Sequence, residues 1–161
     1  MSGGRALWLT GIAAVASGLV AGVFFAFSTF VMAALRRLPA PQGIAAMQSI
    51  NVTVITPLFM LALFGTAVVC VVLAVISLLH WHETAARLVF AGAVTYVLGT
   101  ALVTMAYHVP RNDALDRVDP NASNAPAKWS TFFAEWTHMN HVRTVSALAA
   151  CICFVIALRI E

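Results

Sequence analysis

Four long apolar segments, separated by short polar connections, dominate the hydrophobic pattern of the chain. Charges fall at the ends of these segments: residues 6–35 carry no charge, and Arg36 and Arg37 follow at once. Runs of about 20 apolar residues are long enough to cross a membrane as helices. The pattern therefore predicts an all-α protein, a bundle of four transmembrane helices at about residues 6–35, 52–79, 85–107 and 139–159.

The connection between the third and fourth segments differs from the others. Residues 110–128 hold all three aspartates of the chain, together with three asparagines and three prolines. Residues 119–124 (DPNASN) have the composition of a turn. Asn124 is a suitable N-cap for a helix that begins near Ala125 and continues into the fourth span. We therefore expect a polar loop and an interfacial helix between spans 3 and 4, within a single integral-membrane domain over residues 1–161.

Composition narrows the function classes. The chain is 61% apolar and 9% charged, whereas a soluble domain has about 45–50% apolar and about 25% charged residues. This excludes a nucleic-acid module, a disordered tail and a conventional cytosolic enzyme, and the scattered basic residues form no patch for nucleic acid. The expected partners are membrane lipid and a lipophilic small molecule, with a homo-oligomer or a membrane complex left open. The expected location is the bacterial cytoplasmic membrane.

The spacing of two arginines places a charge inside the membrane. Fifteen residues separate Arg143 from Arg159, about 22 Å of helix, whereas the hydrocarbon core is about 30 Å thick. A span that ends at Arg159 must begin near residue 139, so Arg143 lies about one turn inside. Charges at this depth face the bundle interior and have partners. We expect Asp113 to be the counter-charge, with Asp116 and Glu135 as the alternatives.

The last helix has two polar faces. At 100° per residue, Trp136 and Asn140 share a face with Arg143, and this face has the composition of a pocket wall. The alternative is a snorkelling arginine between interfacial tryptophans. The opposite face carries the weak metal-ligand candidates Glu135, His138 and His141. A di-iron site needs further glutamates, which the spans lack, so interfacial histidines are the favoured interpretation and no cofactor is expected.

The third span supplies an opposing wall. Polar residues recur at every fourth position, which places them on one face of a helix: Tyr96, Thr100, Thr104 and His108. The stripe leads toward Asn112 and Asp113. Thr104, His108 and Asn112 are therefore candidate substrate-binding residues, although threonines can also bond to their own helix backbone.

Several segments, in order along nearly the whole chain, resemble the anthrone oxygenase-like family of small four-helix membrane proteins. They are residues 22–28 (GVFFAFS), 31–35 (VMAAL), 43–51 (GIAAMQSIN), 109–115 (VPRNDAL) and 140–144 (NHVRT), with Trp136. The most specific elements are Pro-x-Asn-Asp-x-Leu and Trp-x-x-x-Asn-x-x-Arg. The chain departs from the family at Ala33, where a proline is frequent, and at Arg111, where an apolar residue is frequent.

The resemblance implies an oxygenase, because fungal relatives are linked to the oxidation of an anthrone to an anthraquinone with O2, without a recognised cofactor. By motif, it singles out Asn112, Asp113, Trp136, Asn140 and Arg143. An anthrone that loses a proton becomes a carbanion that reacts with O2 directly. The chain would then supply a base, Asp113 or His141, and a cation at Arg143 for the developing oxyanion.

A second hypothesis is a non-catalytic membrane protein, either a lipophile-binding protein or a subunit of a larger complex. Small-residue contacts such as Gly18-x-x-x-Gly22 suit helix association in a membrane and favour this hypothesis as well. A proton-coupled transporter is less favoured, because no span carries a carboxylate. Haem electron transfer is less favoured because the five histidines lie near the predicted membrane edges.

Overall fold

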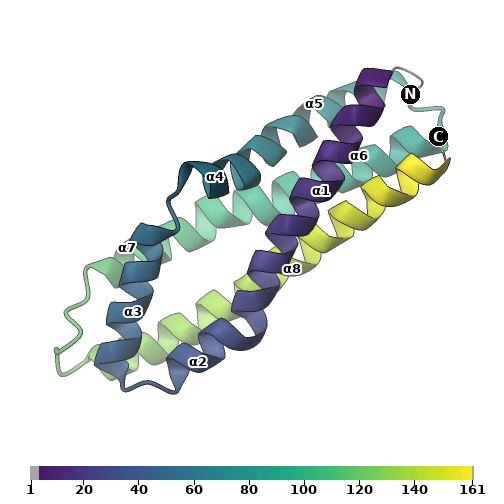
Figure 1. Cartoon of the computed structure of the whole chain (residues 1–161). Helices are drawn as coiled ribbons and strands as arrows, with labels where there is room; N and C mark the ends of the chain where they lie inside the picture. Colours follow the sequence, from purple (N-terminus) through teal and green to yellow (C-terminus); the bar gives the residue numbers. More distant parts are fainter. Residues whose placement is uncertain (1–3, 161) are drawn as a thin grey trace.

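The computed structural model describes residues 4–160, and this part of the chain is all-helical (Figure 1). Four rods are long and apolar enough to cross a membrane, as predicted. The first rod joins α1 (Gly4–Ala26), the π-helical turn η1 (Phe27–Val31) and α2 (Met32–Arg36). After α3 (Ala40–Thr53), the second joins α4 (Pro57–Met60), η2 (Leu61–Gly65) and α5 (Thr66–Leu79). The third joins α6 (Thr84–Tyr96), η3 (Val97–Leu102), η4 (Thr104–His108) and α7 (Val109–Asp116), and the fourth is α8 (Ala125–Ile160).

The second rod begins at Pro57, five residues after the predicted start of the second span, because the chain bends at residues 54–56. A residue before proline is driven out of the helical region, and Thr56 has extended φ and ψ angles of −100° and 147°. The Thr56 hydroxyl then accepts a hydrogen bond from the Phe59 amide at 3.3 Å and caps α4. This bend, the α3–α4 elbow, separates α3 from the second rod.

The third rod continues to Asp116, beyond the predicted end of the span near residue 107, even though Pro110 lies within it. Proline lacks an N–H and crowds the preceding turn of a helix. Here the turn before Pro110 is the wider π-helical turn η4, which gives the ring room. The helix therefore carries Asn112 and Asp113 as part of a rod rather than of a loop.

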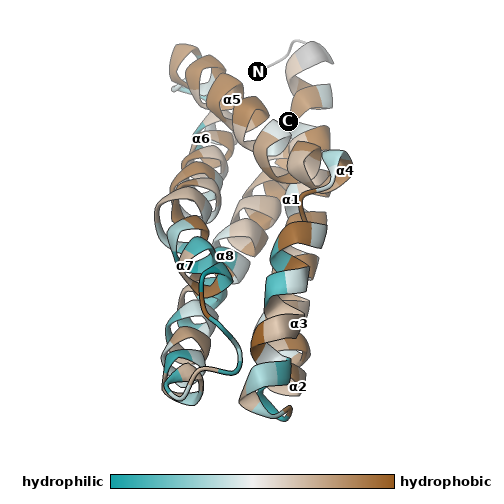
Figure 2. Cartoon of the chain, turned by 90° about the vertical axis from the view of Figure 1, so that its left-hand side faces the viewer, coloured by the Kyte–Doolittle hydropathy of each residue, from teal (hydrophilic) through white to brown (hydrophobic). Residues whose placement is uncertain are grey.

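Two apolar cores lie one after the other along the molecule. The bundle core joins α1, α5, α6 and the second half of α8, around Tyr96 and Phe154. The head core joins α2, α3, α7 and the first half of α8, around Ile44 and Trp129. Figure 2 shows that hydrophilic residues gather toward the head, whereas α5 in the bundle is almost wholly hydrophobic.

The outer face of α8 changes character where one core gives way to the other. In the first half, the exposed side chains are polar, as at Thr131 and Glu135. In the second half they are apolar: Val145 is 65% exposed and Ile152 is 50% exposed. The 36 residues of α8 measure about 54 Å, more than the roughly 30 Å of a hydrocarbon core. The head therefore projects beyond the apolar part of the bundle.

Candidate functional site

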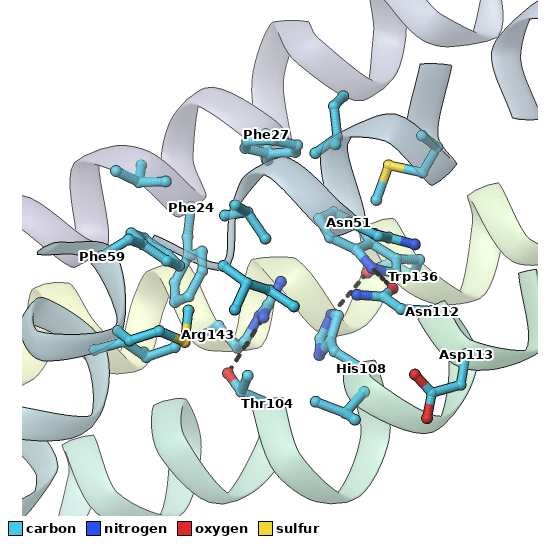
Figure 3. A pocket seen from close by; sticks show the side chains of 18 of the residues that line it. Phe24, Phe27, Asn51, Phe59, Thr104, His108, Asn112, Asp113, Trp136 and Arg143 are labelled. Atoms are coloured by element: carbon cyan, nitrogen blue, oxygen red, sulfur yellow. Dashed lines mark hydrogen bonds between the residues drawn. The ribbon is translucent and has the colours of Figure 1, made fainter. Parts of the chain in front are cut away.

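A cavity of about 240 Å³ lies between the head and the bundle (Figure 3). This is slightly below the roughly 300–1,000 Å³ of typical ligand pockets. All four rods, α3 and the α3–α4 elbow contribute to its wall. Most of the lining is apolar, and the aromatic part comes from Phe24, Phe27, Phe59, Phe64 and Trp136. The cavity therefore suits a flat, largely apolar ligand.

Arg143 is the cation in this wall, and it is only 5% exposed. Its Nη1 donates to Thr104 Oγ1 at 3.2 Å, and its Nη2 donates to Asn140 Oδ1 at 2.6 Å. The guanidinium carbon lies 4.1 Å from the centre of the Phe24 ring and 5.2 Å from that of Trp136. Buried Nε has no hydrogen-bond partner. Two neutral acceptors and two aromatic rings thus hold the guanidinium.

The prediction that Asp113 forms an ion pair with Arg143 is wrong. Within residues 4–160 no carboxylate comes within ion-pair distance of Arg143. The two alternatives are engaged elsewhere: Asp116 accepts a hydrogen bond from Asn51 at 2.9 Å, and Glu135 pairs with Arg111 at 3.0 Å. The reason is the length of the third rod, which keeps helical geometry to Asp116 and holds Asp113 about two and a half turns beyond Thr104.

Asn140 lies on the same face of α8 as Arg143, as predicted, but outside the cavity wall. Its side chain is fully buried. The amide nitrogen donates to the Phe24 carbonyl and to Ser28 Oγ, each at 2.8 Å. Ser28 in turn contacts Thr144 Oγ1 at 3.1 Å. Asn140 therefore joins the first rod to α8 and supports Arg143 from behind.

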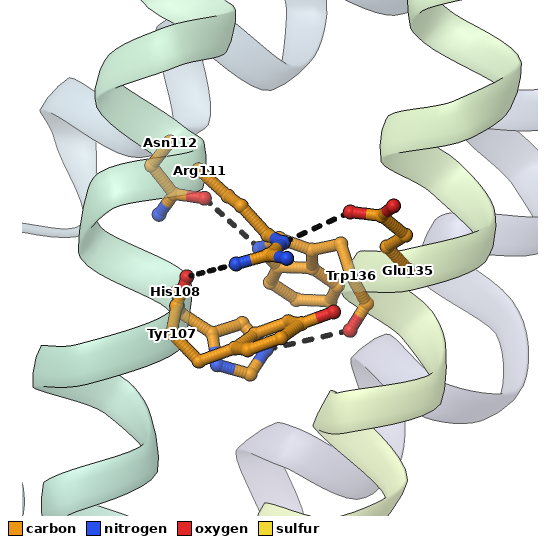
Figure 4. A network of polar contacts seen from close by, with 6 residues as sticks. All are labelled: Tyr107, His108, Arg111, Asn112, Glu135 and Trp136. Atoms are coloured by element: carbon orange, nitrogen blue, oxygen red, sulfur yellow. Dashed lines mark hydrogen bonds and ion pairs between the residues drawn. The ribbon is translucent and has the colours of Figure 1, made fainter.

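A second polar group joins the third rod to α8 (Figures 3 and 4). Trp136 Nε1 donates to Asn112 Oδ1 at 2.9 Å. The His108 ring meets the Trp136 ring edge-on, with centres 5.1 Å apart. Its two nitrogens lie 3.4 Å from the Val103 carbonyl and 3.3 Å from the Trp136 carbonyl. His108 is 1% exposed, and these contacts fix the face that Trp136 turns to the cavity.

The outer end of the cavity is acidic and is bordered by α3. Asp113 and Asp116 line it, and Asp113 is exposed. Across this end, Gln48 of α3 donates to the Leu115 and Val118 carbonyls at 3.0 and 2.9 Å. Together with the bond from Asn51 to Asp116, these contacts hold α3 against the end of α7. The cavity thus runs from a cationic inner end to an acidic outer end.

Three of the π-helical turns, η1, η2 and η4, contribute to the cavity wall. Such turns are rare and occur frequently at functional sites. Phe27 of η1 and Phe64 of η2 line the cavity, as do Thr104 and His108 of η4. The Leu63 carbonyl in η2 accepts a hydrogen bond from the Tyr96 hydroxyl at 3.1 Å. Three rods therefore have a π-helical turn at the level where they surround the cavity.

Three residues that the sequence singled out lie elsewhere. His141, a candidate base, is exposed and does not line the cavity. His138 is also exposed, and Glu135 forms an ion pair with Arg111 that joins α7 to α8 outside the cavity wall (Figure 4). The described residues contain no group of three His, Cys, Asp or Glu side chains that could hold a metal ion. These three residues lie away from the cavity because the helical offset turns their face of α8 away from Arg143.

The sequence interpretation missed the wall that α3 and the elbow provide. Met47, Ile50 and Asn51 of α3 line the cavity, followed by Val54 and Ile55 of the elbow. One signal was present: the buried residues of α3 recur at helical spacing, and this row ends in an amide, Asn51. Asp116 was expected only as an alternative counter-charge, and its partner is this amide.

A family model described as anthrone oxygenase matches residues 58–153. The matched part contains one side of the cavity wall, which includes Phe59, Thr104, His108, Asn112, Asp113, Trp136 and Arg143. The walls from α1 and α3 lie before the match. No curated protein and no solved structure matches the chain.

Proposed function

The chain belongs to the anthrone oxygenase family, and we propose that it is a membrane oxygenase that uses O2 to oxidise a lipophilic, electron-rich aromatic of the anthrone or quinol type. One observation carries this proposal: Arg143 is buried, lies in the wall of an aromatic cavity and has no carboxylate partner among the described residues. A buried charge without a partner is costly. A substrate that becomes anionic would supply the missing partner.

The reaction of an anthrone provides such an anion. Loss of the proton from the ring carbon opposite the carbonyl gives an enolate, with its negative charge shared between that carbon and the carbonyl oxygen. The enolate passes an electron to O2, and recombination forms a carbon–oxygen bond and, after protonation, a hydroperoxide. Loss of the remaining C–H proton and cleavage of the O–O bond release water and leave the quinone. One O2 is consumed for each anthrone.

Arg143 and Thr104 form the inner end of the proposed site. The carbonyl oxygen of the substrate would lie against Arg143, where the guanidinium stabilises the charge that develops on deprotonation. The aromatic walls from Phe24, Phe27 and Trp136 would hold the flat rings. Fixed donors in a site without water stabilise developing charge better than water does, since they need no reorganisation.

Asp113 is the proposed base at the outer end. It lines the cavity, and no hydrogen bond or ion pair within residues 4–160 engages it. It lies nine positions after Thr104 on the same rod, a rise of about 13 Å. In an anthrone, the acidic C–H and the carbonyl lie on opposite edges of the central ring, so groups at opposite ends of a cavity suit them. His108 is less suitable because each of its ring nitrogens lies against a backbone carbonyl, that of Val103 or that of Trp136.

Since the ionised substrate itself reduces O2, we propose that the reaction needs no resident cofactor. We place the protein in the bacterial cytoplasmic membrane, from which a lipophilic substrate can reach the cavity. Four apolar rods support the integral-membrane part of this proposal.

The test is O2 uptake by detergent-purified protein with a dihydroxyanthrone, followed together with the quinone spectrum and with metal analysis of the same sample. We expect one O2 per quinone, at a rate above that of empty micelles and independent of metal content. A rate equal to that of empty micelles, together with tight binding of the anthrone, would instead support a non-catalytic lipophile-binding protein.

A further inference from the structure

Asn140 is fixed in one orientation by its own hydrogen bonds. Both amide N–H groups have acceptors, the Phe24 carbonyl and Ser28 Oγ, each at 2.8 Å. The amide oxygen is therefore the atom that faces Arg143, and it accepts from Nη2 at 2.6 Å. Rotation of the amide by half a turn would bring N–H groups against the guanidinium and leave two acceptors without donors. The contact to Arg143 thus has a defined chemistry: a neutral oxygen.

The other groups around the guanidinium are neutral as well. Thr104 offers a hydroxyl, and Phe24 and Trp136 offer ring faces. These contacts orient the guanidinium and lower the cost of its burial without cancelling its charge. A carboxylate at position 140 would have nearly the same shape as the amide and would form a charged pair at the same distance. The chain has the amide instead.

We propose that Asn140 is a positioning residue that fixes the guanidinium of Arg143 without neutralising it, so that the cavity selects the ionised form of a flat, lipophilic acid. The cavity provides the remaining selection: its aromatic and aliphatic walls bind the apolar body, and Arg143 at the inner end binds the ionised oxygen. The identification of this acid as the substrate rests on the proposed function, but the preference for its anion does not.

Binding measurements test this preference without any catalytic step. The probes are naphthoate and its neutral, nearly isosteric amide, naphthamide, titrated into detergent-purified protein with empty micelles as the blank. Wild-type protein should bind naphthoate more tightly by at least about tenfold, the scale of one charged hydrogen bond. Asn140→Asp should bind naphthoate and naphthamide with similar affinity, because the new carboxylate neutralises the charge of Arg143.

Ser28→Ala is the matched control. It removes one hydrogen-bond acceptor of Asn140 but leaves the neutral oxygen on Arg143, so the preference for naphthoate should persist. Thermal unfolding of each variant shows whether it is folded. If Asn140→Asp does not fold, Thr104→Asp brings a carboxylate to the other terminal nitrogen of the same guanidinium, and the same loss of preference is expected.

Three results would overturn the proposal: equal binding of the two probes by wild-type protein, an unchanged preference in a folded Asn140→Asp or Thr104→Asp variant, or an equal loss of preference in Ser28→Ala. The proposed oxygenase activity can fail separately. Protein that prefers naphthoate but consumes no O2 with an anthrone would keep this inference and refute the activity. Protein that consumes O2 with an anthrone but shows no preference for naphthoate would support the activity and refute this inference.

Discussion

The two halves of α8 lie in different surroundings, although they form one uninterrupted helix. The first half packs into the head and exposes polar residues such as Thr131 and His138. The second half packs into the bundle and exposes apolar residues such as Val145 and Leu148. The change falls near residue 141, within a turn of Arg143. One helix thus passes from a polar to an apolar environment at the level of the cavity.

This difference explains how a single cavity acquires two chemically distinct ends. In the head half of the molecule Asp113 is exposed, so its carboxylate lies beside water. In the bundle half a guanidinium is removed from water, so its attraction for an anion is stronger than at a surface. Neither half alone offers both an exposed carboxylate and a desolvated cation. The candidate site lies where the two halves meet.

The largest expected effect concerns the outer end. Asp113→Asn should reduce the rate of anthrone oxidation by about 10²–10⁴-fold, the usual contribution of a general base. The deficit should shrink as the pH rises, because the anthrone then ionises in water without the base. The measurement is the oxidation rate of both proteins from about pH 6 to about pH 10. Asp119→Asn, in the loop outside the cavity, should behave like wild type, and a pH-independent deficit in Asp113→Asn would refute the assignment.

A pair of charge substitutions tests the boundary itself. Leu148→Asp places a carboxylate on the outer face of the bundle half and should cost about 2.5–3.5 kcal/mol of insertion free energy. Thr131→Asp makes the same addition on the outer face of the head and should change stability by less than about 0.5 kcal/mol. Membrane-inserted yield and thermal unfolding measure both. Equal losses of stability in the two variants would mean that the outer faces of the two halves lie in the same environment.

A pair of glycine substitutions contrasts tight packing with an open face. A Cβ on Gly43 would lie 3.0 Å from the buried Trp129 ring, so Gly43→Ala should destabilise the head by about 1–3 kcal/mol. A Cβ on Gly22 would meet nothing within 4 Å, so Gly22→Ala should stabilise the first rod by about 0.5–1 kcal/mol. Opposite shifts in the unfolding temperature are expected, and shifts of the same sign would contradict the packing of α3 on α8.

The smallest effect concerns the head surface. Glu135 pairs with Arg111, and both side chains are partly exposed, by 48% and 35%. An exposed pair contributes less than about 1 kcal/mol and is screened by salt. Glu135→Ala should therefore lower the unfolding temperature slightly at low salt and not at high salt. A loss that persists in high salt would indicate that the pair does more than hold α7 to α8.

The local pattern of the sequence was sufficient for the rods and for the deep cation. Apolar runs between charges predict four long apolar helices, and the spacing of Arg143 and Arg159 predicts an arginine that faces the bundle interior, where the structure has it buried. Helical spacing also puts Trp136 and Asn140 on its face. These inferences succeed because each depends on the geometry of one helix.

Contacts between helices were not predictable in the same way. The Asp113–Arg143 pair was expected because the loop after the third span must return to the fourth, but the continuation of the third rod through Pro110 holds the two apart. The part of α3 in the cavity wall depends on the elbow at residues 54–56, which only the pre-proline position of Thr56 signals. Whether Asn140 lines the cavity or supports Arg143 depends on the Phe24 carbonyl, 116 residues away.

The most direct test of the central claim compares wild-type protein with Arg143→Met in the same O2-uptake assay with a dihydroxyanthrone. Methionine keeps the bulk and removes the charge. The rate should fall by about 10²–10³-fold, as for loss of an oxyanion donor. The unfolding temperature should hold or rise, because an unpaired buried charge is replaced by an apolar side chain. A folded Arg143→Met variant that consumes O2 as fast as wild type would contradict the claim that this guanidinium binds the ionised substrate.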